Sequence, residues 1–129
     1  MIAVDTNVVV RLLVNDEPRQ FRKAYELFER GDVWIGSTVL LETERVLRSA
    51  YRLPREEIHH LLDNVLSLPG VSCEDRARAH QALENFSKGL DFADALHLAG
   101  ANHLDSFATF DRDLARKAGR LGVVDIMAL

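Results

Sequence analysis

Short apolar stretches alternate with longer amphipathic segments along this chain, and this alternation is the feature that most restricts its fold. The apolar stretches are rich in β-branched residues and predict buried strands. The segments between them have apolar residues at helical spacing and are bounded by Pro, Gly or capping residues. Strands joined through helices form parallel sheets with both faces covered. The sequence therefore predicts the α/β class, as a three-layer α/β/α sandwich with a central parallel sheet of four to five strands.

The predicted elements follow one another without an internal repeat, linker or low-complexity segment. Strands are expected at residues 1–4, 33–35, 71–73, 106–110 and 123–124. Helices are expected at residues 17–30, about 39–52, from 54 onward, 74–88, 91–102 and 111–118. The second and third of these helices have no strand between them. A chain of 129 residues has the usual size of one domain, so we expect a single domain over residues 1–129.

Composition excludes several classes of protein. The formal net charge of −4 argues against binding nucleic acid mainly through a large basic surface. Either nucleic acid is not the ligand, or it is a substrate attracted by bound divalent cations and a few local arginines. The single Cys73 excludes an internal disulfide and a cysteine-based zinc site. We find neither a signal peptide nor a long uncharged apolar segment, so we expect a cytoplasmic protein without a membrane function.

Four acidic residues lie where the predicted strands end or helices begin. Asp5 follows the first strand and Asp111 the fourth, whereas Glu42 lies just over one turn into the helix after the second strand. Asp94 lies in the first turn of the helix that begins near Asp91. Because ligand sites of open α/β sheets lie beyond the carboxyl ends of the strands, we expect these carboxylates to converge. Hard oxygen ligands suit Mg²⁺ or Mn²⁺ rather than zinc, and this favours phosphate chemistry.

Taken singly, each acid also has an ordinary structural interpretation. Asp91 can cap a helix while Asp94 interacts favourably with the helix dipole. Asp111 can likewise be a helix cap and Asp5 a turn residue. Only the four together, in this order and with these intervening elements, form a specific signal.

Four stretches of the chain carry a resemblance to a known family. IAVDTNVVVRLL, STVLLETERVLRSAY, LDFADALHLAGA and FATFDRDL resemble the PIN-domain family, and among its members the VapC toxins of toxin–antitoxin pairs. The resemblance spans almost the whole chain. It implies that the catalytic, metal-binding acids are Asp5, Glu42, Asp94 and Asp111. It further implies auxiliary acids at Asp91 and Asp113 and supporting polar residues at Asn7 and Thr109.

The choice of Glu42 needs the resemblance, because Glu44 is only two residues away. The two side chains flank the buried face of their helix on opposite sides, and periodicity alone does not choose between them. In the family the Ser before this helix stands five residues ahead of the ligand, which matches Ser37 and Glu42. This leaves Glu44 as a solvated or ion-paired side chain. Arg45 is expected on the solvated face in contact with Glu42.

Two rows of arginines are candidates for contacts with RNA. One row includes Arg45, and the other contains Arg112 and Arg116 beside Asp111. Guanidinium groups suit phosphate, although a solvated helix face is an equally ordinary interpretation. The aromatic side chain of Phe110 is expected in the core rather than stacked on a base.

The resemblance implies a function. A PIN domain of this type is a Mg²⁺- or Mn²⁺-dependent endoribonuclease, the toxin of a pair that inhibits translation by cleaving RNA through metal-activated water. The implied partners are the RNA substrate, a cognate antitoxin and a second copy of the chain in a homodimer. The alternative is a PIN-fold module that binds RNA or protein without catalysis. A phospho-receiver domain needs a lysine near the end of a late strand, and this chain has none there. A dehalogenase-type phosphatase needs a second Asp two residues after the first, where this chain has Asn7.

Overall fold

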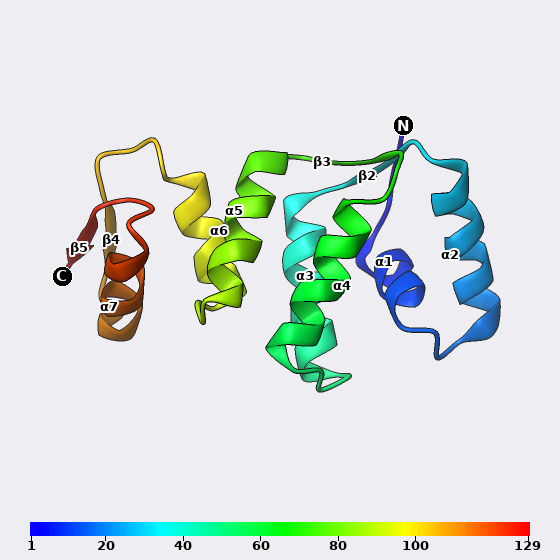
Figure 1. Ribbon diagram of the computed structural model, residues 1–129, viewed down its shortest axis with the longest axis horizontal. Coiled ribbons are helices and arrows are strands. Elements are labelled where there is room, and N and C mark those ends of the chain that lie inside the picture. Colours follow the sequence, from blue (N-terminus) through cyan, green and yellow to red (C-terminus); the bar gives the residue numbers. More distant parts are fainter. The chain divides into compact units, whose positions relative to one another are not determined.

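The computed structural model describes residues 1–129 and contains seven helices and five strands (Figure 1). It divides into two compact units, Met1–Arg76 and Ala77–Leu129. The first unit contains β1 (Ile2–Ala3), α1 (Thr6–Leu13), α2 (Pro18–Arg30), β2 (Val33–Ile35), α3 (Ser37–Ser49), α4 (Arg55–Leu66) and β3 (Val71–Cys73). α5 (Arg76–Ser87) begins at the boundary, and the second unit continues with α6 (Phe92–Gly100), β4 (Phe107–Thr109), α7 (Arg112–Leu121) and β5 (Ile126–Ala128).

The strands pair only in parallel, as the helical connections require. In the first unit β2 lies between β1 and β3, with Val33 opposite Ile2 on one side and Val71 on the other. In the second unit β4 pairs with β5. The α/β class is therefore confirmed, and the structure is consistent with α/β/α layering. The predicted number of strands is wrong, because the sheet of the first unit has three strands instead of four to five and β4 and β5 form a sheet of their own.

The core of the first unit lies around β2, α3 and α4. The side chains of Val33 and Ile35 on β2 are fully buried because β2 is the central strand. α3 and α4 contact each other through apolar faces that include Leu47 and Leu62, both fully buried. These side chains follow the helical periodicity of the sequence.

α1 is an element that the sequence analysis did not assign. Its run of three valines is β-branched and favours strands, so propensity alone argues against a helix. Two features override this preference. Asp5 caps the first turn, and Val9 and Val10 lie on one face with Thr6, where all three side chains are buried. α1 contacts both α2 and α3, so burial of this face stabilises the helix in its place.

Two predicted boundaries differ from the observed ones. The last strand was expected at Val123-Val124, but β5 spans Ile126–Ala128. The reason is Gly122, which ends α7 in the left-handed conformation at φ 67°, so the next residues serve as the connection to β5. α3 ends at Ser49 rather than near residue 52, because Arg52 takes φ 55° and turns the chain toward Pro54.

The second unit has its own apolar core between α5 and α6. Ala82, Leu83 and Phe86 of α5 are buried, as are Phe92 and Leu98 of α6. The rings of Phe86 and Phe92 meet edge to face with their centroids 5.4 Å apart, a favourable arrangement for two aromatic rings.

The expectation of a single domain over residues 1–129 stays a prediction, because each of the two units is compact in itself. None of the seven helices combines the length and the apolar character that crossing a membrane requires.

Candidate functional site

Asp5 follows β1 and caps α1. Its backbone is extended, with φ −91° and ψ 176°, and its Oδ1 atom accepts a hydrogen bond of 3.2 Å from the backbone N–H of Val8. This bond satisfies one of the N–H groups that the first helical turn leaves free. The side chain is exposed, and the cap engages only one of its two oxygens. The other oxygen of Asp5 is therefore available to a ligand.

Thr6 links the start of α1 to Glu42 on α3. The hydroxyl of Thr6 donates a hydrogen bond to Oε1 of Glu42, 36 residues further along the chain. Thr6 is buried, whereas the carboxylate-bearing side chain of Glu42 is exposed. This bond fixes Glu42 beside the first turn of α1, whose cap is Asp5. Two of the predicted site acids thus lie at the same end of the first unit.

Sequence reasoning missed the part that Thr6 plays. It treated the residue only as one of the turn and cap types that follow the first strand. Thr6 lies three and four residues before Val9 and Val10, which places its side chain on the buried face of α1. A polar side chain on a buried face needs a hydrogen-bond partner, so this spacing is the signal that could have identified it.

Glu44, the neighbouring acid on α3, is buried rather than solvated. Only 2% of its side chain is exposed, and its Oε2 atom accepts a hydrogen bond of 2.9 Å from Nε of Arg48. The ion pair expected for Glu44 is present, with Arg48 as its partner. The expected contact between Arg45 and Glu42 is not formed, because Glu42 bonds to Thr6 instead and Arg45 lies exposed. The assignment of Glu42 rather than Glu44 to the site stays a prediction.

In the second unit, Asp91 and Asp94 stand at the start of α6. Oδ2 of Asp91 accepts a hydrogen bond of 3.2 Å from the backbone N–H of Asp94, so Asp91 is the helix cap that its position allows. Asp94 follows in the first turn, and its side chain has intermediate exposure. The cap engages the carboxylate of Asp91, so the carboxylate of Asp94 is the freer of the two to bind a ligand.

Asp111 is held at the end of β4 by its neighbours. The hydroxyl oxygen of Thr109 accepts a hydrogen bond of 3.0 Å from the backbone N–H of Asp111. Oδ1 of Asp111 in turn accepts bonds of 3.0 Å from the backbone N–H groups of Asp113 and Leu114, which caps α7. Thr109 thus fixes the backbone that carries Asp111, and its supporting role in a site stays a prediction.

Asp94 experiences the charges of the other acids of its unit. Partial burial raises the pKa of Asp94 above its usual range, and the negative charges of Asp91 and Asp111 raise it further. The positive charges of His97 and Lys117 oppose this shift. Like charges that crowd one another in this way are relieved by a bound cation. Asp91 and Asp111 therefore lie near enough to Asp94 for their charges to act on it.

Asp113 has partners that make it a weaker candidate for a metal ligand. Hydrogen bonds from Lys117 and Arg116 lower the pKa of this exposed carboxyl, and both cations form ion pairs with it. Arg116, predicted as a contact for RNA, is thus partly neutralised by Asp113. Arg112 and Arg45, the other two candidates, are exposed and form no ion pair. Their contacts with RNA stay predictions.

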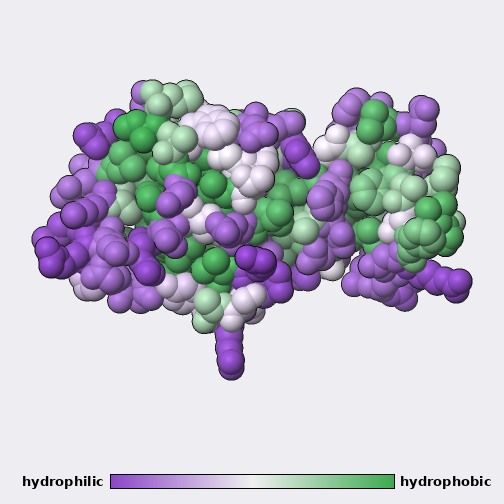
Figure 2. Space-filling model, turned by 180° about the vertical axis from the view of Figure 1, so that it is seen from behind, coloured by the Kyte–Doolittle hydropathy of each residue, from purple (hydrophilic) through white to green (hydrophobic).

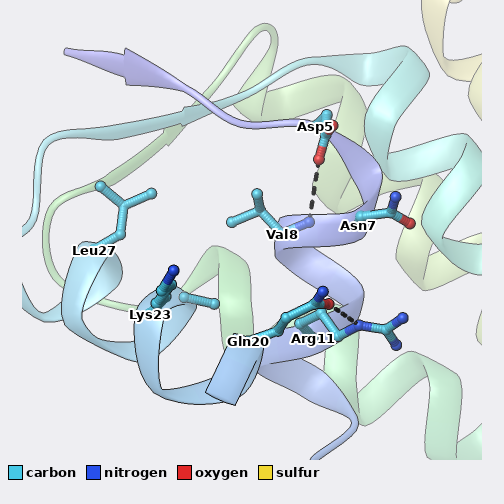
Figure 3. Close-up of a pocket in the computed structure, with 8 residues that line it drawn as sticks. Asp5, Asn7, Val8, Arg11, Gln20, Lys23 and Leu27 are labelled. Carbon is cyan, nitrogen blue, oxygen red and sulfur yellow. Dashed lines mark hydrogen bonds between the residues drawn. The ribbon is translucent and has the colours of Figure 1, made fainter. Parts of the chain in front are cut away.

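The remaining predictions concern Asn7 and Phe110. Asn7 is exposed and lines a pocket together with Asp5, so it lies beside the acid that it was expected to support (Figure 3). Phe110 was expected in the core, and this is wrong: 80% of its surface is exposed. It lies between β4 and the cap residue Asp111, where the chain leaves the sheet and no core surrounds it.

The donor chemistry of these residues fits a hard divalent cation. Asp5, Glu42, Asp94 and Asp111 offer carboxylate oxygens without a neighbouring thiolate, which suits Mg²⁺ or Mn²⁺. The free oxygen of Asp5 and the raised pKa of Asp94 agree with this. Within neither unit do three or more acidic, histidine or cysteine side chains form a group that could hold a metal ion. Asp5 and Glu42 belong to the first unit and Asp94 and Asp111 to the second, so a site that uses all four stays a prediction.

Residues 2–120 match the family model described as PIN domain, which covers both units and all four predicted acids. A search of the curated proteins found no match.

Proposed function

Because this chain belongs to the PIN-domain family, whose members are generally metal-dependent nucleases, we propose that it is a metal-dependent endoribonuclease. The observation that carries the proposal is that the family match over residues 2–120 contains all four predicted acids, three of them at strand ends or helix starts and Glu42 just over one turn into α3. Asp5 and Asp111 each follow a strand and cap the helix after it, and Asp94 lies in a first helical turn. Acids in such positions at several separate elements serve as a ligand set.

Asp5, Glu42, Asp94 and Asp111 would hold Mg²⁺ or Mn²⁺ together. When bound, the cation supplies polarisation of the scissile phosphate and activation of water for in-line attack. Thr6 would orient Glu42 through its hydroxyl, and Thr109 would fix the backbone of Asp111. No side chain has to act as a nucleophile, and cleavage then yields 5′-phosphate and 3′-hydroxyl ends.

The biological role that we propose is that of a VapC-type toxin, which inhibits translation by cleaving RNA. The four sequence stretches that resemble these toxins support this role, and so does the agreement in the order of their acids. The same resemblance supports a cognate antitoxin, a homodimer and a cytoplasmic location. Exposed Arg45 and Arg112 support contacts with the phosphates of the substrate, since neither guanidinium is used in an ion pair.

The alternative function is a PIN-fold module that binds RNA or protein without cutting it. The free carboxylate oxygen of Asp5 and the crowding of charge around Asp94 favour the nuclease, because a binding module gains nothing from acids that repel its ligand. Of the two functions, only the nuclease gives a task to the carboxylate of Asp94 and to the oxygen of Asp5 that the helix cap leaves free.

The test is incubation of the purified, antitoxin-free protein with total cellular RNA in Mg²⁺, in Mn²⁺ and in EDTA. Discrete fragments with 5′-phosphate ends should form only with metal and be absent with Asp5→Asn and Asp94→Asn. Asp105→Asn is the matched control, because it removes the same charge from an exposed side chain outside the predicted site. If folded wild type binds RNA but leaves it intact, the binding module replaces the nuclease.

A further inference from the structure

A pocket of about 390 Å³ lies between α1 and α2, and Asp5 forms part of its wall (Figure 3). Its other lining residues include Val8 and Arg11 of α1 and Gln20, Lys23 and Leu27 of α2. A pocket of this volume falls within the range of small-ligand sites and accommodates a nucleotide-sized group. Whatever occupies it lies next to Asp5.

Arg11, one of the two cations of this pocket, is already engaged. Its Nε atom donates a hydrogen bond of 2.6 Å to Gln20, and one of its terminal nitrogens donates to Asp16 at 3.3 Å and to the hydroxyl of Tyr51 at 3.0 Å. Figure 3 shows its guanidinium directed away from Lys23. Arg11 therefore holds α1, α2 and the end of α3 together, and its charge is not free for a ligand.

Lys23, the second cation, has no such engagement. It is exposed and forms neither an ion pair nor a hydrogen bond, not even with Asp5 on the same pocket. In Figure 3 its ammonium group points from α2 into the space bordered by Val8 and Leu27. We propose that Lys23 binds a backbone phosphate of the RNA, next to the scissile one, so that this pocket is a substrate subsite. The inference rests on the proposed nuclease function and adds a substrate-binding residue to it.

The charges along α2 indicate the direction in which the RNA leaves the pocket. The side of the first unit where α2 lies, at the left of Figure 2, is largely hydrophilic. Arg19 lies one turn before Lys23, also without an ion pair, and both line an adjoining hollow of about 230 Å³ together with Glu17. On the other side of Lys23 the surface carries Glu26, Glu29 and Arg30. Apart from Lys23, the charges of the first hollow balance and the second has an excess of negative charge, so the backbone should pass from Asp5 over Lys23 toward Arg19.

A lysine suits this task because phosphate contacts position the substrate without reading its sequence. Its ammonium acts as a point charge for one phosphate. The plain alternative is a solvated lysine on a helix surface, which would leave binding unchanged when it is replaced.

The test compares Lys23→Ala with Arg22→Ala. Arg22 is the adjacent residue of the same helix, is exposed, and lines a different hollow with Phe21 and Tyr25, so its replacement removes the same charge outside the subsite. Binding of a fluorescent single-stranded RNA, taken from a mapped cleavage site, is measured by anisotropy in an Asp94→Asn background that does not cut. We expect Lys23→Ala to weaken binding roughly three- to tenfold and to reduce the salt slope by about 0.7. Arg22→Ala should bind as the parent does, and Lys23→Arg should restore affinity.

An RNA in which a neutral methylphosphonate replaces the phosphate next to the scissile one tests whether Lys23 binds that phosphate. The replacement should weaken binding of the parent but not of Lys23→Ala, because the contact that it removes is already missing there. In the active enzyme, which retains Asp94, Lys23→Ala should raise KM and leave kcat within about twofold of the wild-type value. If Lys23→Ala and Arg22→Ala behave alike while Asp5→Asn still abolishes cleavage, the subsite is disproved and the nuclease stands. If wild type neither binds nor cuts RNA, the proposed function fails and the subsite with it.

Discussion

The hydroxyl of Thr6 donates a hydrogen bond to the carboxylate of Glu42, which connects the first residue of α1 with the middle of α3. The donor is buried and the acceptor is exposed, so the bond fixes an acid at the surface from within the core. Because Asp5 caps the same helix that Thr6 begins, this one hydroxyl determines how two predicted metal ligands lie relative to each other.

Thr6→Val keeps the shape of the side chain and removes this hydrogen bond. We expect the free energy of unfolding to fall by about 1 kcal/mol, the typical net contribution of such a bond. Cleavage should fall roughly tenfold, as when a group that orients a metal ligand is lost. Urea unfolding and the cleavage rate measure the two effects. Thr6→Ser is the control that retains the hydroxyl, and equal behaviour of the two variants would contradict the role of Thr6.

Replacing Arg11 tests the network that joins α1, α2 and α3. Arg11→Ala removes its hydrogen bonds to Gln20, Asp16 and Tyr51 together. We expect a loss of about 1–3 kcal/mol in the free energy of unfolding, because bonds to charged groups are stronger than neutral ones. Tyr51→Phe should lose less, since the contact between Arg11 and Asp16 remains. Urea unfolding of both variants gives the comparison, and an Arg11→Ala protein as stable as wild type would show that the network contributes nothing.

The raised pKa of Asp94 predicts how the stability of the metal-free protein depends on pH. The folded protein holds this proton more tightly than the unfolded chain does. The stabilisation is therefore complete below the ordinary value of 3.8 and is lost as the pH rises through the raised pKa. At neutral pH in EDTA the ionised carboxylate destabilises the fold, so Asp94→Asn should be more stable than wild type.

This gain of Asp94→Asn should shrink as the pH is lowered toward 3.8, where wild type also becomes neutral at this position. Urea unfolding at several pH values between neutral and acid measures it. Asp105→Asn serves as the reference, because it makes the same replacement at an exposed side chain outside the predicted site. A variant that is less stable than wild type at neutral pH, or a difference that does not change with pH, would contradict the crowding of charge around Asp94.

Two glycines provide a matched pair for backbone strain. Gly70 has φ 79°, and a Cβ atom there would lie 2.7 Å from Cα of Gly31. Gly70→Ala should therefore cost more than about 2 kcal/mol. Gly119 lies within α7 with open space around it, so Gly119→Ala should stabilise the protein by about 0.5–1 kcal/mol. Thermal or urea unfolding compares the two, and equal effects of the same substitution would contradict this account of Gly70.

The sequence predicts the parts of this fold that depend on a strong local pattern. The helices with clear periodicity and the strands of residues 33–35 and 71–73 are found as expected, because burial of their apolar faces agrees with their local propensity. α1 was missed because its valines favour a strand, and the cap at Asp5 and the packing against α2 and α3 decide otherwise. Local propensity contains no information on such contacts.

The candidate site likewise has features that the sequence predicts and features that it does not. The caps formed by Asp91 and Asp111 follow from residue type and position and could be predicted. The burial of Glu44 could not, because periodicity places this residue only at the flank of the buried face, and the packing of α3 against α1 and α4 decides what is covered. The link between Thr6 and Glu42 and the free cation of Lys23 also depend on tertiary packing. Neither has a signature in the spacing of the acids.

The most direct test of the account is the rate at which one identified RNA is cut as the Mn²⁺ concentration is raised. We predict that wild type and Asp105→Asn reach the same saturating rate. Asp5→Asn and Asp94→Asn should each lose roughly 100-fold or more, because the proposed nuclease needs both carboxylates as metal ligands. Folded Asp5→Asn or Asp94→Asn protein that cuts at the rate of wild type would contradict the assignment of these acids to the site.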